Sequence, residues 1–572
     1  MNSRIAARDT DAILLEPIIR ATKRFYVTVA ILLVFILWGA YAYLTQFQRG
    51  LGVTGLNRPI SWGFYITNFV FFIGISHAGT LISAILRICN AEWRRPITRM
   101  AEVITVMVLA IGAGNILVDL GRPDRMLNLI RYGRYQSPLL WDATSITAYF
   151  TASTVYLWQP LIPDIAILRD KVTHREWFYR ILAIGWQGTQ RQKAVLTRGI
   201  SIMAILVIPI AVSVHSVVSF VFSMTLQPAW HSTIFGPYFV VGAIFSGIAA
   251  LIIAMLIIRK VYGLEAYLKP VHFYHLGTLL LVMSLLWSYF TFSEYLTGYY
   301  GSEPEEMTVF WSKFLGPYAP YFWVMVFCNF VIPVTVLSYR KTHTIPRTLI
   351  ASCTICVGMW LERFIIVVPT LANPRLHYGA GTYFPTWVEW GETSASFALF
   401  ILFYVLFTKF FPIISIWEIR EGREHGLHEV TQRVQEYLPD TGIDEARAAE
   451  RSPVCTAIDK PANRNENHPN STDSGIIRFF QYMLPTSFTI VNVGVIVWII
   501  SLIRLSNKLH DVPSASIGIS IVAIPVFLIL LGVMWYVFLG IMLNREESKD
   551  SGVEAASGLE NTPKESLIAS LT

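Results

Sequence analysis

Long apolar stretches separated by short polar segments dominate this chain. Twelve such runs can be traced, at residues 25–46, 62–88, 98–120, 138–160, 198–226, 231–258, 272–297, 317–338, 346–371, 393–418, 485–506 and 515–543. An apolar run of about 20 residues crosses the roughly 30 Å hydrocarbon core of a bilayer as an α-helix. Each run should be helical because lipid cannot satisfy free backbone groups. The pattern predicts an all-α integral membrane protein with about twelve transmembrane helices.

The composition supports this prediction. Hydrophobic residues make up 54% of the chain and charged residues 15%, against about 25% charged residues in soluble domains. The spacing of the runs divides the chain into a cytoplasmic N-terminus (1–24), a ten-helix membrane core (25–418), a cytoplasmic linker (419–480), a two-helix membrane hairpin (481–543) and a flexible cytoplasmic tail (544–572). Within the linker, "EVTQRVQEYL" predicts one short amphipathic helix.

The basic residues indicate the topology. Of the 45 Lys and Arg residues, 33 lie in the N-terminus, the even-numbered loops and the tail, whereas 10 lie in the odd-numbered loops. Positive residues accumulate on the cytoplasmic side, so both termini are predicted to be cytoplasmic. The net charge of +7 then reflects topology rather than a nucleic-acid partner. The first run is long for a signal peptide, although Ala40-Tyr41-Ala42 would suit cleavage, and we expect a retained helix.

Two of the runs open alike. "WGFYITNFVFFIG" begins the second run and "FGPYFVVGAIFSG" begins the sixth, and both have an aromatic-Gly-x-Tyr start and a final Gly. Helices that are four apart share one orientation. The echo favours two parallel four-helix bundles, formed by helices 2–5 and 6–9, with chance similarity among aromatic-rich helices as the alternative.

Ionisable side chains gather at the end of the third run, in "NILVDLGRPDR" (115–125). An ionisable group in a spanning helix costs at least roughly 2–3 kcal/mol and often marks function. Asn115, Asp119 and Arg122 are spaced i, i+4 and i+7, so they share one helix face. Gly112 and Gly114 are expected to let a neighbouring helix approach closely.

The fourth run adds a second carboxylate. It starts with "SPLLWDATSITAY", which places Asp142 about one turn into its helix and at a depth similar to that of Asp119. Two carboxylates in a partly apolar site suit proton acceptance near neutral pH. The alternative is that Asp119 pairs with Arg122 or Arg125 and that Asp142 caps its helix.

Further polar groups lie inside other predicted helices. His77, midway down the second helix, is either a hydrogen-bonded packing residue or part of a cavity. Glu362 and Arg363 lie in the middle of the ninth helix, and a buried Arg363 needs a carboxylate partner, for which Glu294 is the first candidate. His215, His275 and Glu294 complete a set that is either a structural ion network or a proton path.

The chain lacks several signatures. It has no Walker A sequence, no Rossmann glycine pattern and no cluster-binding set of cysteines. "CTIC" (353–356) has no second pair nearby, so we expect no metal site. No helix carries two histidines at the roughly four-turn spacing that would stack two haems. Any electrons must therefore pass to another subunit.

Several motifs together resemble a known family. "VDLGRPDR" followed by "SPLLWD" resembles the signature of the NrfD or polysulfide-reductase-type membrane subunits, which bind quinone. "SHAGTLISAIL", "WLERFIIVVP" and "PTWVEW" (385–390) are similar to the larger membrane subunits of alternative complex III, a bacterial quinol-oxidising assembly. The resemblance covers about residues 55–420. The appended hairpin and linker lie outside it.

The resemblance implies a function and its partners. Quinol, expected to be menaquinol, would bind in the first bundle at the outer face, near His77, Asp119, Arg122 and Asp142, with the two aspartates as proton acceptors. The alternative complex III subunits often have His where this chain has Asp119. Electrons would pass to an iron–sulfur subunit, so the chain itself would hold no haem or iron–sulfur cluster.

The same resemblance implies the setting. The chain would lie in the bacterial inner membrane among lipid, further membrane subunits, one of them homologous, and cytochrome subunits. His215, Glu294, Glu362 and Arg363 would form part of a second proton route. Two other classes stay open. A secondary transporter without a redox role fits the buried charges but lacks a Gly/Pro-broken helix pair. A haem-bearing cytochrome needs paired axial histidines.

Overall fold

Helices form all the regular structure in the described part of the chain. The computed structural model describes residues 10–77, 79, 82–134, 137–339, 343–376, 381–423, 471–508 and 523–543. Within these ranges every regular element is an α-, 3-10 or π-helix. The all-α prediction is confirmed.

Ten of the described helices are long and apolar enough to cross a membrane. They are α2 (Lys23–Arg49), α5 (Thr98–Asp119), α9 (Gln190–Ser223), α10 (Phe235–Val261), α11 (Pro270–Gly301), the continuous Ala319–Leu337, α15 (Ile345–Ala372), α16 (Trp387–Phe410), Gly475–Arg504 within α20 (Ser471–Lys508), and Ala523–Leu543. The protein is therefore a multi-pass membrane protein. Ala319–Leu337 comprises α13 (Ala319–Val326), a π-helical turn (Phe327–Val331) and α14 (Ile332–Leu337).

The two remaining apolar runs also form helices, with one difference from the prediction. Residues 138–160 lie in α7 (Pro138–Lys171), whereas run 62–88 is split into α3 (Phe64–His77) and α4 (Ser83–Ile88). Gly79 lies at the split, and a Cβ there would lie 1.8 Å from the Ala101 carbonyl oxygen of α5. The hydroxyls of Thr105 and Tyr149 donate to the Ser76 carbonyl oxygen, at 2.6 and 3.0 Å. Side chains thus satisfy backbone that the broken helix leaves free.

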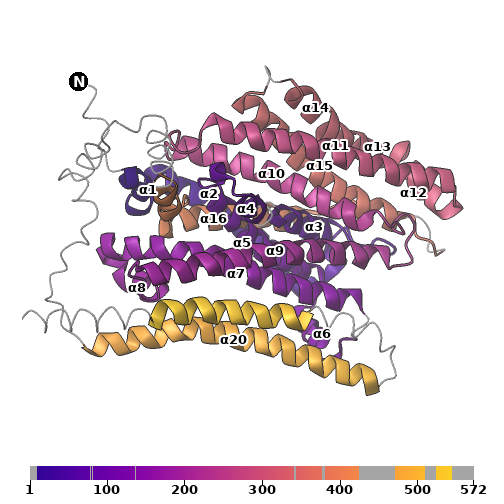
Figure 1. Ribbon diagram of the computed structural model, residues 1–572. Helices are drawn as coiled ribbons and strands as arrows, with labels where there is room; N and C mark the ends of the chain where they lie inside the picture. The colour runs from indigo at the N-terminus through magenta and orange to yellow at the C-terminus, as the bar shows by residue number, and fades with distance from the viewer. Residues whose placement is uncertain are drawn as a thin grey trace, which may run out of the picture.

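The long helices run nearly parallel, along the horizontal of Figure 1. The short helices α1 (Thr10–Ile19) and α8 (Glu176–Leu182) lie at one end, and α6 (Met126–Tyr132) and α12 (Pro304–Phe314) at the other. We call these the α8 end and the α12 end. α3, α5, α7 and α9 pack on one another, and α10, α11, α13–α14 and α15 form a second packed group. α3 joins the groups through α10 and α15.

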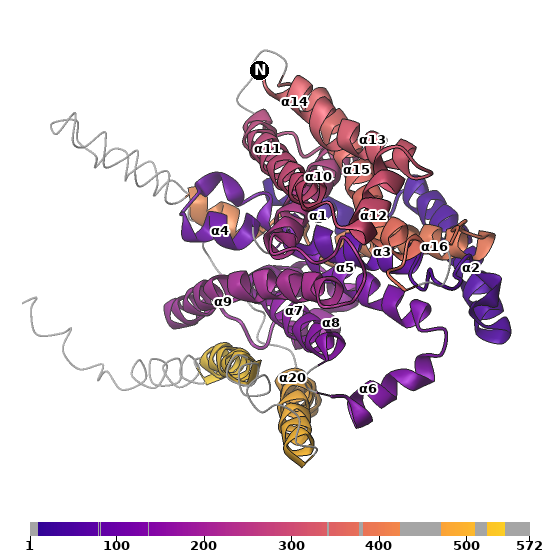
Figure 2. The same cartoon turned by 90° about the vertical axis from the view of Figure 1, so that its right-hand side faces the viewer.

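Four helices, α2, α16, α20 and Ala523–Leu543, flank these groups, as the view along the helix axes shows (Figure 2). α2 packs on α16. α20 and Ala523–Leu543 lie beside α7 and α9. Gln192 of α9 donates to the Ile541 carbonyl oxygen at 2.9 Å, and Trp498 of α20 donates to the Ile130 carbonyl oxygen at 2.8 Å. The C-terminal hairpin is therefore attached to the core along its length.

Several predicted boundaries shift. α1 falls inside the predicted N-terminal segment, α16 begins at Trp387 rather than 393, and α20 begins at Ser471, inside the predicted linker. The amphipathic helix predicted at 429–438 lies outside the described residues. Gly112 packs against α3, as expected, but a Cβ on Gly114 would meet nothing within 4 Å, so its expected role in close packing was wrong.

Candidate functional site

A group of buried polar side chains lies at the α12 end, where α2 and α5 finish and α3 and α16 begin. We call Gln46, Tyr65, Asp119, Glu389 and Glu392 the carboxylate cluster. The Tyr65 hydroxyl donates to Gln46 Oε1 at 2.6 Å, and Gln46 Nε2 donates to the Val118 carbonyl oxygen at 2.8 Å. Both side chains are fully buried. All three carboxyl groups of the cluster act electrostatically on the Tyr65 hydroxyl.

Glu389 is the fixed member of the cluster. It closes the capping box of α16 with Thr386. One carboxyl oxygen accepts from the backbone N–H groups of Gly55 and Thr386, at 2.8 and 2.9 Å, and the other accepts from the Tyr383 hydroxyl at 2.5 Å. With both oxygens occupied, Glu389 ties α16 to the loop before α3 and is a positioning group.

Asp119 and Glu392 differ from Glu389 because each keeps an unoccupied carboxyl oxygen. Asp119 Oδ1 and Glu392 Oε1 are buried and accept no hydrogen bond within the described part of the chain. The carboxyl of Asp119 lies close enough to Glu389 for the two to repel when both are ionised. A buried carboxyl oxygen without a donor is costly. These two oxygens are therefore the best-placed proton acceptors of the cluster.

Of the other residues predicted for this site, Asp142 is buried and Arg122 is not. Asp142 is 5% exposed in the second turn of α7, and its Oδ1 accepts no hydrogen bond from the described residues. Arg122 is exposed and pairs with Asp124, with 2.9 Å between Nη2 and Oδ2. The alternative in which Arg122 pairs with Asp119 is therefore wrong, and Asp119 lacks a basic partner among the described side chains.

His77 lies deeper in the molecule, in contact with His215. Twelve residues separate it from Tyr65 along α3, which corresponds to about 18 Å of helix. Its ring centroid lies 3.7 Å from that of His215, and its Nε2 lies 2.6 Å from the Ala211 carbonyl oxygen. Both histidines are fully buried. The structure thus places His77 with a residue predicted for the proton path rather than beside Asp119.

The predicted pair Glu362 and Arg363 lies next to His215. His215 interacts electrostatically with Arg363. Arg363 Nη1 lies 3.6 Å from Glu362 Oε2, and both side chains are 1% exposed. Glu362 Oε1 accepts from Trp287 Nε1 at 2.9 Å. The guanidinium lies over the Phe239 ring, 4.8 Å from its centroid. We call His77, His215, Glu362 and Arg363 the central group.

Glu294 is not the partner of Arg363, and that first candidate was wrong. Glu294 accepts a hydrogen bond from Ser232 and interacts electrostatically with Lys313 of α12. It lines a cavity of about 520 Å³ at the α12 end, together with Tyr238, Tyr295 and Lys313. Burial lowers the pKa of Lys313 to about 8, although Glu294 opposes the shift.

This cavity approaches the central group through two tyrosines. Tyr238 lies in the electrostatic range of Glu362, and Tyr295 lies in the electrostatic range of both Glu294 and Glu362. The segments "WGFY" and "FGPY" resemble each other, and Tyr65 and Tyr238 are their corresponding tyrosines. Each tyrosine therefore stands beside buried carboxyl groups at the α12 end of its own helix.

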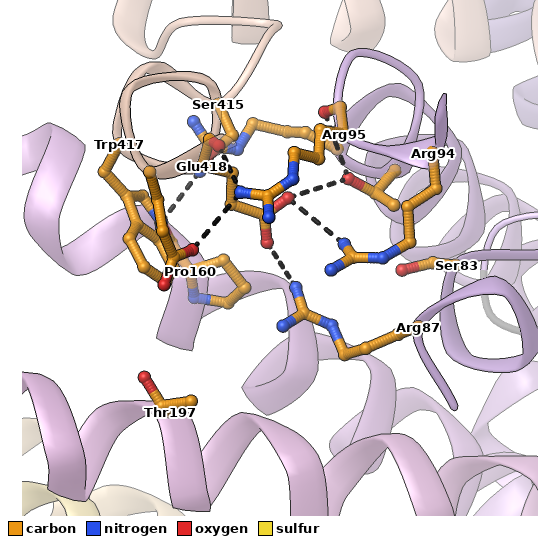
Figure 3. Close-up of polar contacts among 12 residues, drawn as sticks. Ser83, Arg87, Arg94, Arg95, Pro160, Thr197, Ser415, Trp417 and Glu418 are labelled. Carbon is orange, nitrogen blue, oxygen red and sulfur yellow. Dashed lines mark hydrogen bonds and ion pairs between the residues drawn. The ribbon is translucent and has the colours of Figure 1, made fainter. Parts of the chain in front are cut away.

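A third polar set lies at the α8 end (Figure 3). Glu418, after α16, accepts from Arg87, and its Oε2 lies 3.3 Å from Arg94 Nη1. Arg99 pairs with Asp164 and donates to the Pro160 carbonyl oxygen at 2.8 Å. These contacts join segment 411–423 to α4, α5 and α7. Burial would raise the pKa of Glu418, but Arg87 and Arg94 lower it below its ordinary range.

Sequence reasoning missed Gln46, Tyr65, Glu389 and Glu392. The signal was present in part, because "PTWVEWGET" carries two acidic residues three apart at the start of a helix. Glutamine and tyrosine in apolar helices gave no comparable signal. Among the described residues, no group of three or more His, Cys, Asp or Glu side chains is arranged to hold a metal ion.

Comparison with known proteins identifies the family. The sequence profile described as "Polysulphide reductase, NrfD" matches residues 52–374, which include α3 to α15 and most of the polar groups above. The chain belongs to this NrfD family. The match begins after Gln46 and ends before Glu389 and Glu392, so these three members of the carboxylate cluster lie outside it.

Three relatives of this NrfD-family chain share at most 24% identity with it. A selenate reductase subunit of Mesobacillus selenatarsenatis is 23% identical over 65% of this chain and 90% of its own length. The Hdr-like menaquinol oxidoreductase integral membrane subunit of Archaeoglobus fulgidus is 24% identical over 62% and 81%. The menaquinone reductase integral membrane subunit of Nitratidesulfovibrio vulgaris is 21% identical over 64% and 87%. Against a further relative, from Halobacterium salinarum, the chain spans about half, 51%, of that protein's length.

Proposed function

We propose that this chain is the quinol-oxidising membrane subunit of a multi-subunit respiratory or photosynthetic electron-transfer complex of the alternative complex III type. The observation that carries the proposal is the pair of buried, unoccupied carboxyl oxygens on Asp119 and Glu392 beside Tyr65. Family membership supports a redox role. One relative is named as a menaquinol oxidoreductase subunit and another as a menaquinone reductase subunit. Menaquinol is therefore the proposed substrate.

The chemistry suits these side chains. Oxidation of a quinol to a quinone releases two electrons and two protons. Asp119 and Glu392 would accept the protons at the quinol hydroxyl groups, with Asp142 as a further acceptor. Glu389 and Gln46 would hold α16 and Tyr65 in place. Aromatic side chains flank the cluster, since the Phe64 ring lies 5.0 Å from each of Trp360 and Trp390. These aromatic side chains would give the quinol ring an apolar surface to bind against.

We further propose the setting. The α12 end faces outward, so both termini are cytoplasmic and protons leave on the outer side of a bacterial inner membrane. Electrons pass to an iron–sulfur subunit docked at this end, and cytochrome subunits and a homologous membrane subunit complete the complex. The two helix groups would be parallel four-helix bundles.

The central group supports a second, proton-conducting role in the same complex. The buried residues His77, His215, Arg363 and Glu362 lie in the middle of the helices. Tyr238 lines the same cavity as Glu294 and lies in the electrostatic range of Glu362. Coupling of electron transfer to proton movement through these residues is the proposed role. A secondary transporter without redox chemistry would use the same groups.

Electron transfer from menaquinol to an artificial dye, measured on the purified complex, tests the proposal. Asp119→Asn and Glu392→Gln should each lower kcat at least about tenfold, because a general base contributes about 10²–10⁴ in rate. Asp142→Asn should lower it less. Asp124→Asn, an exposed acid at the same end, is the control and should leave the rate unchanged.

The outcomes separate the alternatives. Normal turnover of both Asp119→Asn and Glu392→Gln would remove the carboxylate cluster from the reaction. Failure of the intact wild-type complex to oxidise any quinol would favour the transporter. A haem absorption band from the isolated chain would favour a membrane cytochrome.

A further inference from the structure

A large groove at the α8 end lies far from the carboxylate cluster. It has a volume of about 1120 Å³ and is bounded by α1, α2, α3, α10 and α16. This exceeds the roughly 300–1,000 Å³ of ordinary small-molecule pockets. The groove therefore suits a larger occupant than a metabolite.

The depth of the groove matches half a bilayer. Its lining runs from Ala250 to Val261 along α10 and from Phe397 to Lys409 along α16. At 1.5 Å per residue, each stretch covers about 17–18 Å, which is roughly half of a 30 Å hydrocarbon core. An occupant of this length corresponds to the lipid of a single leaflet.

The groove is apolar at its deep part and basic at its mouth, which matches the apolar chains and charged head group of a lipid. Phe71, Phe72 and Ile75 of α3 lie at its deep part, whereas Lys23 and Arg24 lie at its mouth, at the start of α2. Both basic residues are exposed. The first turn of α2 contains no acidic residue, and the partial positive charge of a helix N-terminus adds to theirs.

The other basic residues at the mouth are already engaged. Lys409 Nζ donates to the carbonyl oxygens of Pro17 and Arg20, at 2.6 and 2.8 Å, and Arg20 pairs with Glu16 at 3.5 Å. Lys409 thereby fixes the bend between α1 and α2 at the mouth. Lys23 and Arg24 pair with no acidic side chain among the described residues, so both remain available to bind an anion.

We propose that this groove binds one anionic phospholipid, with its phosphate at Lys23 and Arg24 and its acyl chains along α10 and α16. Basic pockets between transmembrane helices bind anionic lipid head groups. The lipid would also bridge α2 to the core. α2 packs on α16, yet only 17% of the most apolar stretch of α2 is buried within the protein.

Lipid analysis of the purified complex tests this proposal. The complex would be reconstituted with vesicles of equal parts phosphatidylglycerol and phosphatidylcholine, re-extracted in mild detergent, and its retained lipids measured by mass spectrometry. The wild type should retain phosphatidylglycerol at about one molecule per chain and at least about tenfold over phosphatidylcholine. The double variant Lys23→Gln/Arg24→Gln should lose most of this preference.

Two further variants make the result specific. Lys193→Gln/Arg198→Gln removes two exposed basic residues from α9, in its first turns and away from the groove, and should keep the wild-type preference. Ala254→Phe fills the groove from α10 and should lower retention of the whole lipid. Because Lys23 and Arg24 are surface residues, their double variant stays informative if Ala254→Phe does not fold.

Contrary results overturn the proposal. Equal retention of phosphatidylglycerol by the wild type and Lys23→Gln/Arg24→Gln would do so, as would a wild type without preference for the anionic lipid. Recovery of a quinone instead of a phospholipid, lost in Ala254→Phe, would assign the groove to a different ligand.

Discussion

The imidazole rings of His77 and His215 lie with their centroids 3.7 Å apart, at the meeting point of α3 and α9. His77 has a carbonyl partner at Nε2, whereas neither ring nitrogen of His215 has a hydrogen-bond partner among the described residues. Two buried rings this close cannot both carry a proton at low cost. At most one of the two rings is therefore expected to be protonated at a time.

Substitution of His215 tests its proposed role in proton movement. His215→Gln keeps a polar side chain but cannot titrate. Proton release from proteoliposomes, followed with a pH-sensitive dye during quinol oxidation, should fall at least about fivefold. Quinol oxidation in detergent should change less than twofold, because the carboxylate cluster is intact. His272→Gln, at the start of α11 and outside the central group, is the control. Equal loss of both activities would make His215 a structural residue.

The Glu362–Arg363 pair gives a prediction of stability. Removal of one partner leaves a buried charge without compensation, which typically costs about 3–5 kcal/mol. Arg363→Gln should therefore lower the thermal unfolding temperature markedly, whereas Glu362→Gln/Arg363→Gln should recover much of the loss. Tryptophan fluorescence of the protein in detergent would measure this. A double variant that is less stable than Arg363→Gln would contradict the prediction.

Gly79 offers a test of the break between α3 and α4. A Cβ at this position would lie 1.8 Å from a backbone oxygen and 2.0 Å from Thr105 Oγ1. Gly79→Ala should lower the free energy of unfolding by about 1–3 kcal/mol, the usual cost of overpacking. Gly114→Ala, which meets open space on α5, should be neutral or slightly stabilising. Similar unfolding temperatures for the two variants would argue against the close approach of Gly79 to α5.

Glu418 leads to a prediction of pH dependence. Its pKa in the folded protein is lowered by Arg87 and Arg94. A lowered carboxylate pKa stabilises the fold fully above the unfolded pKa, near 4.5, and this contribution is lost as the pH falls through the folded value. The stability difference between wild type and Glu418→Gln should thus be constant from pH 7 to about 5 and shrink below. A difference that grows on acidification would refute this assignment.

The sequence allowed prediction of the helices better than of their neighbours. Apolar runs located the ten spanning helices because hydrocarbon imposes length and composition on each one separately. The break after His77 was missed, since its cause is the close approach of Gly79 to another helix. Asp119 could be singled out from its own run. Glu389 and Glu392 left only a partial signal in the sequence, and their place beside Asp119 became visible when α16 was packed beside α5.

The second helix group was harder to interpret from sequence. Glu362 and Arg363 are adjacent in the sequence, and adjacent residues on a helix point in different directions, which made Glu294 the more plausible partner. The guanidinium instead lies 3.6 Å from the carboxylate of Glu362. Long flexible side chains can override the spacing rule in this way.

The position of α20 and Ala523–Leu543 against α7 and α9 has a consequence for biosynthesis. A ribosome makes this chain from its N-terminus, so α7 and α9 enter the membrane well before the hairpin that later lies beside them. Their side of the molecule is first open to lipid and to newly made neighbours, and then becomes covered by the chain itself. Any component that contacts this side directly must arrive before translation ends.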